Sequence, residues 1–284
     1  MRVAFATCAA LPDGWDDNAA AATLLGAEHV VWDDPGVDWE AFDRVVIRST
    51  WDYTGRLDAF LAWCRMVGPR RLRNVPDLVA FNADKRYLAQ LGVETVPTTY
   101  VGPGEPLPRL EGELVVKPNV SAGARDTGRF GPGAHAGARS LIERIQASGR
   151  AALVQPYMPS VDSRGETSFV FLAGERSHIL RKRAVLEPDE VAPLADGMHA
   201  PARAMLREDL VTTAKADDAE RALAGRVLAE VSERFGTPLY ARVDIVMNPE
   251  GRPVLLELEA IEPALYLGLV PGAAERLAAA VLAS

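Results

Sequence analysis

The sequence predicts an α/β protein whose C-terminal part is α+β, and three observations carry this prediction. Up to about residue 78, short β-rich runs alternate with helical stretches, which is typical of a small parallel α/β unit. A glycine-rich segment follows an apolar strand in the middle of the chain. Near the C-terminus, two strand-like runs flank a turn and predict an antiparallel hairpin. We therefore expect three units, at 1–78, 79–152 and 153–284, that share a cleft.

The balance of charges narrows the class of partner. The chain has 284 residues, 48% of them hydrophobic, which is ample for a sizeable core. Its 39 acidic residues exceed its 31 basic residues, and the formal charge of -8 repels phosphate backbones and anionic lipids. We therefore expect a small-molecule partner and neither nucleic acid nor a membrane.

Cysteine usage points to a reducing compartment. Cys8 and Cys64 are too few for a secreted disulfide framework or a thiolate metal site, and the four histidines have no ligand spacing. The N-terminal MRVAFATCAALPDG turns acidic quickly, which is typical of a first strand rather than a signal peptide. We expect a cytoplasmic protein. The sequence leaves the oligomeric state open, a homodimer included.

The first two units follow from local patterns. Strands are predicted at 3–7, 29–32 and 44–50, with the helical stretches DDNAAAATLLGA and LDAFLAWCRMV between and after them. A helix is predicted from Asn82, a good N-cap, to Gly92. The connector GPGEPLPRLEG then leads to the strand ELVVKP, the glycine-rich SAGARDTGRFGPGAHAG and a helix at about 137–149.

The last unit is richer in strands. It starts with ALVQPYM and continues with the strand-like runs ETSFVFL and SHILRKR. A long helix is predicted over 215–235, followed by the pair LYARVDIVM and RPVLLELEA. The turn NPEG, residues 248–251, separates the two members of that pair, so we expect them to form the hairpin.

The register of this hairpin decides which side chains meet. If Met247 lies opposite Arg252, then Arg242 faces Glu257 and Asp244 faces Leu255. Because side chains alternate with period two, one face then carries the four charged residues Arg242, Asp244, Glu257 and Glu259.

The carboxylates of that face have two interpretations. An antiparallel hairpin often has one solvated face, on which acidic residues carry no function. Tyr240, Val246 and Leu255 are expected on the same face, however, and they suit a lined cleft better than open water. Converging carboxylates repel one another unless a cation lies among them, and Mg²⁺ takes carboxylate oxygens together with substrate phosphates. We therefore favour a metal site.

Two lysines and a glycine-rich loop offer a place for those phosphates. Lys117 ends the strand ELVVKP directly before the loop, whose glycines let backbone N–H groups approach an anion and let the loop close as a lid. Lys85 is expected in the first turn of the preceding helix, where its charge adds to the positive helix end. Each feature alone is typical of a solvated surface, but their combination with the carboxylate face is informative.

In this order, the features resemble the ATP-grasp superfamily of carboxylate–amine ligases. The resemblance covers about residues 78–263: a helix lysine, a strand lysine before a glycine-rich flap, the hinge VQPYM, Arg-x-Asp, and a pair in the place of Glu-x-Asn. It implies an N-terminal parallel α/β substrate domain, a central lid domain and a C-terminal antiparallel-sheet domain. Glu259 departs from the pattern, because most of the superfamily has Asn there, and this leaves the metal count open.

The resemblance also implies ATP and two Mg²⁺ ions as cofactors, with a role for each matching residue. Lys85 and Lys117 would contact the α- and β-phosphates, and Arg242 would neutralise the phosphoryl group during transfer. The flap over the phosphates would contain Ser121, Ala122 and Gly123. The adenine hinge would be Gln155, Pro156, Tyr157 and Met158, and the ribose ligand Asp162. The metal ligands would be Asp244, Glu257 and Glu259, with Arg183 a further candidate for phosphate or substrate.

Three longer phrases are similar to the branch of that superfamily that contains D-cycloserine synthetase, an O-ureido-D-serine cyclo-ligase. They are RSTWDY at 48–53, KPNVSAGARDTGRF at 117–130 and ELEAIEP at 257–263. This implies activation of a carboxylate as an acyl phosphate and closure of a ring by a nitrogen of the same molecule. Two alternatives remain: an intermolecular amino-acid or dipeptide ligase, and a nucleotide-binding protein without turnover. A protein that only binds a nucleotide gains nothing from two metals at the γ-phosphate.

The phrase RSTWDY is a candidate substrate pocket. Its strand delivers Arg48 and Ser49 to a C-terminal end, where open α/β sheets bind ligands. Arg48 suits a carboxylate, Asp52 suits an ammonium group, and Trp51 can wall the space between them. The alternative is an internal salt bridge between Arg48 and Asp52 that closes a loop.

Overall fold

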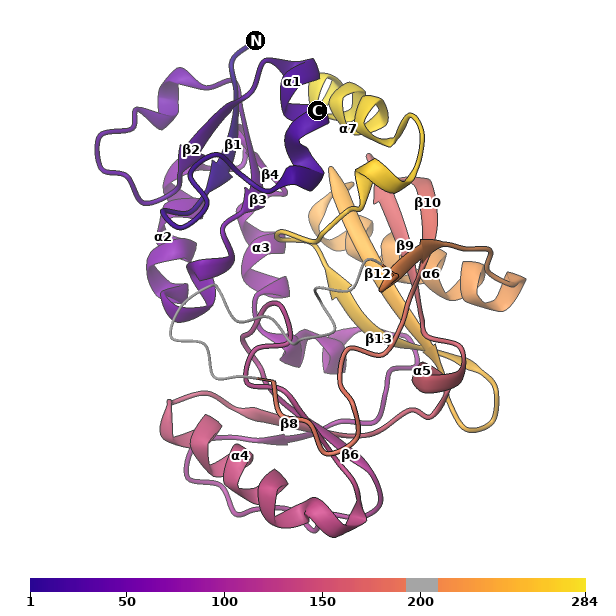
Figure 1. Ribbon diagram of the computed structural model, residues 1–284. Helices are drawn as coiled ribbons and strands as arrows, with labels where there is room; N and C mark the ends of the chain where they lie inside the picture. The colour runs from indigo at the N-terminus through magenta and orange to yellow at the C-terminus, as the bar shows by residue number, and fades with distance from the viewer. Residues whose placement is uncertain (193–208) are drawn as a thin grey trace.

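The computed structural model describes residues 1–192 and 209–284, and in these ranges the chain forms three sheets of four, five and four strands. Figure 1 shows the N-terminal sheet and its helices above, the C-terminal sheet beside them, and the middle sheet with one helix below. This arrangement confirms the predicted α/β class with an antiparallel C-terminal part. The predicted unit boundaries stay a prediction. None of the helices described is long and apolar enough to cross a membrane.

The N-terminal sheet is parallel, with the strand order β2-β1-β3-β4. Its strands are β1 (Val3–Thr7), β2 (Glu28–Val31), β3 (Arg44–Ser49) and β4 (Leu72–Arg73). The helices and 3-10 turns around it are η1 (Asp16–Asn18), α1 (Ala19–Leu25), η2 (Trp39–Ala41), η3 (Trp51–Gly55) and α2 (Leu57–Val67). The predicted strands are therefore confirmed to within a residue or so.

The predicted helix from Asn82 to Gly92 is wrong. The chain instead forms α3 (Pro76–Asn82) and then the 3-10 turn η4 (Lys85–Gln90), which Asp84 caps by accepting the N–H of Arg86 at 2.9 Å. Pro76 starts α3 earlier because proline suits the first turn of a helix. Asn82 does not cap a helix, since its amide bonds the backbone of Leu258 and Ala260 across the fold.

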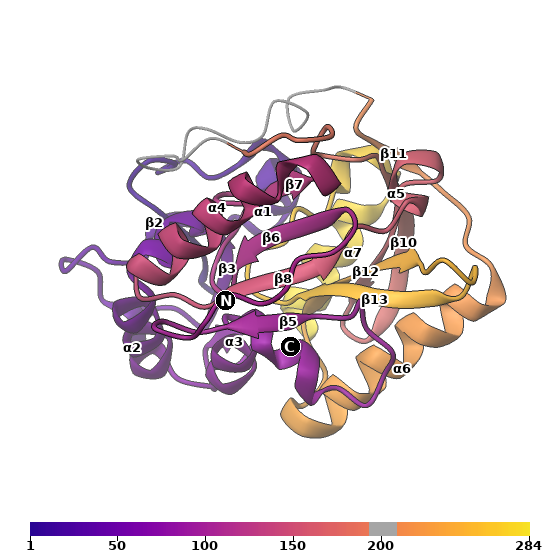
Figure 2. The same cartoon turned by 90° about the horizontal axis from the view of Figure 1, so that it is seen from below.

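The middle sheet is antiparallel, with the order β5-β8-β6-β7. Its strands are β5 (Thr99–Val101), β6 (Leu114–Pro118), β7 (Gly128–Phe130) and β8 (Ala152–Pro156). The turn η5 (Pro132–Ala134) leads into α4 (His135–Ala147), which packs Leu141, Ile142 and Ile145 against this sheet (Figure 2). Part of the predicted glycine-rich loop is therefore strand β7, and the loop between β6 and β7 is shorter than expected.

The C-terminal sheet is antiparallel, with the order β11-β10-β9-β12-β13. One face packs on α6 through residues such as Phe169 and Val243, and part of the other packs on α1 and α7 through Tyr240 and Leu180. Figure 1 shows α7 beside α1, so the C-terminus returns to the N-terminal unit. The elements are α5 (Ser160–Ser163), β9 (Glu166–Leu172), β10 (Glu175–Lys182), β11 (Val211–Thr213), α6 (Asp218–Phe235), β12 (Tyr240–Met247), β13 (Pro253–Glu259), η7 (Leu267–Leu269) and α7 (Ala273–Ala283).

The predicted register of the β12/β13 hairpin is wrong by two residues, but the charged face survives. Arg242 pairs with Glu259 and Asp244 with Glu257, because the turn shifts the pairing by one residue and a bulge next to Asp244 and Ile245 adds another. A shift of two preserves the face on which a strand residue lies. Leu255, on the far side of the bulge, lies instead on the face that packs on α6.

Candidate active site

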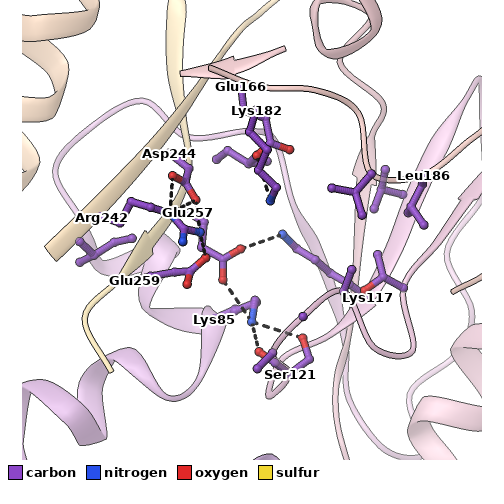
Figure 3. Close-up of a pocket in the computed structure, with 18 of the residues that line it drawn as sticks. Lys85, Lys117, Ser121, Glu166, Lys182, Leu186, Arg242, Asp244, Glu257 and Glu259 are labelled. Carbon is purple, nitrogen blue, oxygen red and sulfur yellow. Dashed lines mark hydrogen bonds and ion pairs between the residues drawn. The ribbon is translucent and has the colours of Figure 1, made fainter. Parts of the chain in front are cut away.

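A pocket of about 280 Å³ lies among side chains of the middle and C-terminal sheets and of segments that follow the N-terminal sheet, such as the turn η3. The part of the C-terminal sheet that does not pack on α1 and α7 forms one wall, and the loop after β6, the end of β8 and the turn η3 complete it. Figure 3 shows Glu257 pointing toward Lys85 and Lys117, while Asp244 and Glu259 lie beside Arg242. The pocket thus brings together groups that lie more than 150 residues apart in the sequence.

Glu257 lies between the two predicted lysines. Its Oε1 is 3.2 Å from Lys85 Nζ, and its Oε2 is 4.0 Å from Lys117 Nζ. Lys85 also donates to the backbone oxygen of Ser121 at 2.7 Å, so it touches the loop after β6. Burial raises the pKa of Glu257, but the charges of Lys85 and Lys117 outweigh burial and leave that pKa below its ordinary value. Burial lowers the pKa of Lys117.

Arg242 forms ion pairs with the other two carboxylates of the hairpin face, Asp244 and Glu259. Its Nη2 lies 2.9 Å from Asp244 Oδ2 and also bonds Glu259, while its Nη1 donates to the carbonyl of Ala264 at 3.0 Å. Burial raises the pKa of Glu259 to about 7; Arg242 opposes that shift, and the nearby Glu257 and Asp244 add to it. Arg242 therefore offsets burial and the neighbouring carboxylates only in part.

The three carboxylates have the chemistry of a magnesium site. In the parts of the chain that the structure describes, no group of three Asp, Glu, His or Cys side chains is disposed to hold one ion, since Glu257 faces lysines and Asp244 and Glu259 face Arg242. Their oxygens are nevertheless the donors that Mg²⁺ prefers, and burial, together with the charges of Glu257 and Asp244, raises the pKa of Glu259. The three carboxylates fit Mg²⁺ once Lys85, Lys117 and Arg242 exchange them for other partners.

Sequence reasoning missed two residues at this wall, Glu166 and Lys182. They pair across β9 and β10, their charged groups lie 3.6 Å apart, and both line the pocket. The available signal was the period-two alternation in SHILRKR, because adjacent strand residues point to opposite sides. Arg183, the residue predicted instead, is exposed and bonds Asp209 at 2.7 Å outside the pocket lining.

The predicted flap and hinge residues all line the pocket. They are Ser121, Ala122 and Gly123 in the loop after β6, and Gln155, Pro156, Tyr157 and Met158 at the end of β8. Tyr157 N–H donates to the carbonyl of Glu113, and the carbonyl of Met158 accepts from Val161. Among the described residues, this leaves the Tyr157 carbonyl and the Met158 N–H without a hydrogen-bond partner.

Asp162 does not line the pocket. Arg129 donates to both of its oxygens, at 2.8 and 2.7 Å, and the Tyr157 hydroxyl donates at 2.6 Å. These hydrogen bonds from Arg129 and Tyr157 hold the pKa of Asp162 below its ordinary value. Its contact with a ribose stays a prediction. To make that contact, Asp162 would have to release Arg129 and Tyr157.

Most of the RSTWDY segment points away from the pocket. Arg48 donates to Asn18 at 2.7 Å and to the carbonyl of Pro263 at 2.9 Å, and Asp52 accepts from the Trp32 indole at 2.9 Å and binds Arg56. Ser49 accepts from a backbone N–H. Trp51 does line the pocket, as does Tyr53, which sequence reasoning missed. The predicted substrate contacts of Arg48, Ser49 and Asp52 stay predictions, and the alternative Arg48–Asp52 bridge does not form.

Comparison with known proteins places this chain in a family. Residues 3–74 match the model of the N-terminal domain of D-cycloserine synthetase DcsG. The cycloserine biosynthesis protein DcsG of Streptomyces lavendulae is 36% identical over 274 residues, which cover 90% of this chain and 88% of that protein. The crystal structure of D-cycloserine synthetase DcsG superposes with a TM-score of 0.82 at 33% identity, covering 99% of this chain and 98% of that one.

More distant structures share the fold alone. The D-alanine–D-alanine ligase of Bacillus anthracis, complexed with ATP, has a TM-score of 0.63 at 14% identity, with 100% of this chain and 96% of that chain covered. A RimK domain ATP-grasp protein of Sphaerobacter thermophilus has a TM-score of 0.63 at 18% identity, with 99% and 100% covered. These likenesses confirm the predicted ATP-grasp fold. The chain is an enzyme that belongs to the DcsG family of ATP-grasp ligases.

Proposed function

We propose that the enzyme uses ATP and Mg²⁺ to activate the carboxylate of an amino-acid-like substrate as an acyl phosphate, which a nitrogen of the same molecule then attacks. The proposed substrate is O-ureido-D-serine and the product D-cycloserine. The observation that carries the ATP part is the placement of two buried lysines and Arg242 against three carboxylates in one pocket. The substrate part is supported by the likeness to DcsG over nearly the whole chain.

The pairs in the pocket suggest how charge is redistributed when ATP binds. Lys85 and Lys117 would exchange Glu257 for phosphate oxygens, and Arg242 would turn toward the transferring phosphoryl group. Backbone N–H groups of the loop containing Ser121, Ala122 and Gly123 would cover the phosphates. Asp244, Glu257 and Glu259 would hold Mg²⁺, which supplies further neutralisation of the phosphate charge when it is bound.

The opposite end of the pocket suits the nucleoside. The unpartnered Tyr157 carbonyl and Met158 N–H offer an acceptor and a donor to the edge of an adenine. For the ribose, Glu166 is available in the pocket lining, whereas Asp162 is held by Arg129. A carboxylate at Glu166 can accept hydrogen bonds from two sugar hydroxyls.

The proposed chemistry needs no side-chain nucleophile. A substrate carboxylate oxygen attacks the γ-phosphorus and ADP leaves; a nitrogen then attacks the acyl carbon, loses a proton, and phosphate leaves. For O-ureido-D-serine, the product also lacks the carbamoyl group, so the balance requires one water and release of CO₂ and NH₃. The protein's contribution is positioning and charge neutralisation.

The test measures phosphate release from ATP in the presence of Mg²⁺, once with O-ureido-D-serine alone and once with added amino acids. Mass spectrometry then identifies the product. We expect one phosphate per D-cycloserine without any second amine. Phosphate release only when an amine is added would instead favour an intermolecular ligase. Binding of ATP with no release under any condition would favour a nucleotide-binding protein without turnover.

Three predictions from the sequence remain: a homodimer, unit boundaries at residues 78 and 152, and a cytoplasmic location. Sedimentation of the purified protein checks the homodimer.

A further inference from the structure

The loop that follows β13 is fastened to its surroundings through its backbone. Side chains of four other segments bond successive residues of this loop. Most loops lie at the protein surface and are held less firmly, so this one is unusual. The bonds join Asn82 and Asn74 to Ala260, Tyr240 to Ile261, Trp51 to Glu262, Arg48 to Pro263 and Arg242 to Ala264, at 2.8–3.4 Å. The position of Glu262 is therefore fixed before any ligand binds.

Glu262 is a buried carboxylate that faces the pocket. Its exposed fraction is 8%, and it lines the pocket beside Trp51 and Tyr53. No cation in the described ranges forms an ion pair with it, and the hydrogen bond its carboxylate receives comes from its own backbone N–H. Burial, with the charge of Glu259, raises the pKa of Glu262 to about 8. The charges of Lys85 and Arg48 oppose this shift only in part, and a buried carboxylate without an ion-pair partner is costly, so this place suits a cation.

Tyr53 is a second polar group in the same corner. It is 5% exposed and lines the pocket, and its hydroxyl has no hydrogen-bond partner within residues 1–192 and 209–284. Burial raises the pKa of Tyr53, and among the carboxylates Glu262 adds the most, ahead of Glu259 and Glu257. Glu262 therefore faces the end of the pocket that the N-terminal unit lines, and Glu257 faces the lysines.

We propose that Glu262 binds the α-ammonium group of the amino-acid substrate, with Trp51 and Arg48 as positioning residues that bond the carbonyls of Glu262 and of the following Pro263. The proposal rests on the proposed function, because it names a contact of the same substrate. Aromatic rings beside the carboxylate suit an organic ammonium ion, which can lie against a ring face. Mg²⁺ would instead require further oxygen ligands or waters there.

The contact predicts specificity for an amino group. In O-ureido-D-serine, the nitrogen that closes the ring is part of the ureido group, so an analogue with a hydroxyl in place of the α-ammonium retains every reacting atom. The intact enzyme should therefore prefer the ammonium substrate strongly over the hydroxyl analogue. Glu262 should account for most of that preference.

The decisive variant is Glu262→Gln, with Glu250→Gln in the exposed hairpin turn as the matched control. Glu262→Gln should lower kcat/KM for O-ureido-D-serine by about ten- to a hundred-fold, the range expected for a hydrogen bond to a charged group. It should change kcat/KM for the hydroxyl analogue and the KM for ATP by less than about three-fold. Glu250→Gln should change none of these values.

Trp51→Phe tests the positioning role, since it keeps a ring but removes the indole donor to Glu262. We expect a smaller drop in the preference for the ammonium substrate, with unchanged KM for ATP. An equal loss with both substrates in Glu262→Gln would mean that the residue only supports the fold, and would overturn the proposal. So would a wild-type enzyme that does not distinguish the two compounds.

Calorimetric binding separates this proposal from the proposed function. The wild-type protein and Glu262→Gln are titrated with both compounds in the presence of Mg²⁺ and a non-hydrolysable ATP analogue. Binding without phosphate release would refute the proposed function, while the ratio of the two Kd values still decides the role of Glu262. Failure of the wild-type protein to bind O-ureido-D-serine would refute both.

Discussion

The β12/β13 hairpin and the segment from Arg48 to Tyr53 both carry charged residues that the sequence singles out, yet the fold uses them differently. All four charged residues predicted for the hairpin face line the pocket. In the second segment, Arg48 and Asp52 bond the protein's own groups, and Trp51 and Tyr53 line the pocket instead. The hairpin presents its charges to the pocket. In the second segment, Arg48 holds the loop that carries Glu262, and Asp52 bonds Arg56 and the Trp32 indole.

The difference has a geometric origin. On a strand, alternation fixes the face of each side chain, and even the two-residue error in register left the charged face intact. Arg48 lies on β3, but Trp51 and Asp52 lie in the 3-10 turn η3, which has no period of two. The partners of Arg48, Asn18 and Pro263, are 30 and 215 residues away, so no local pattern could reveal them.

The largest effect is expected from Glu257→Gln, which tests the hairpin side of this comparison. Loss of its charge should lower kcat by about a hundred-fold or more, because the residue faces both lysines and is a proposed metal ligand. The measurement is phosphate release at saturating ATP. Circular dichroism should show an unchanged fold, and near-normal turnover in a folded Glu257→Gln protein would refute the assignment of this face.

A smaller effect is expected in the second region from Arg48→Lys. Lysine has one nitrogen in place of the two that bond Asn18 and Pro263, so the loop carrying Glu262 should loosen. The KM for the amino-acid substrate should then rise by about ten-fold, or about 1.4 kcal/mol. The KM for ATP should stay nearly constant. A rise in the ATP KM alone would show that Arg48 serves the nucleotide instead.

Asp52→Asn is the matched comparison within that segment. Asp52 bonds Arg56 and the Trp32 indole outside the pocket, so its loss should leave both KM values unchanged. Because the pair with Arg56 is partly exposed, the free energy of unfolding should fall by only about 1 kcal/mol, as urea denaturation can measure. A raised KM for the amino-acid substrate would instead support the prediction from the sequence that Asp52 takes the ammonium group.

The sequence predicted those parts of the site that depend on strands and on the order of features. Lys117, the flap and the hinge all line the pocket, and so does Lys85 although its helix is a 3-10 turn. Glu166 and Lys182 escaped notice because they meet only through the register of a second hairpin, β9/β10, which contains a bulge that no local pattern reveals. The phrase ELEAIEP contains Glu262, but its role depends on a loop conformation that contacts from four other segments determine.

The smallest effect concerns the flap, where the same contrast between strand and loop predicts which arginine trypsin can reach. Arg129 lies in β7, is 4% exposed and binds both Glu113 and Asp162, so the peptide bond after it should resist cleavage. Arg125 lies in the loop between β6 and β7 and bonds the Trp51 carbonyl at 2.5 Å and Thr54 at 3.0 Å. We expect cleavage after Arg125 in the free protein, reduced several-fold by Mg²⁺ and a non-hydrolysable ATP analogue.

Arg109 provides the internal control for this experiment, because its side chain is 89% exposed and it does not line the pocket. Cleavage after Arg109 should proceed at one rate with and without nucleotide, whereas the fragment ending at Arg125 should appear more slowly with it. Mass spectrometry of the early fragments distinguishes these sites from Arg129. Early cleavage after Arg129, or equal rates at Arg125 in both conditions, would mean that this loop does not close over the phosphates, since a lid that binds the nucleotide must lose accessible backbone when it does so.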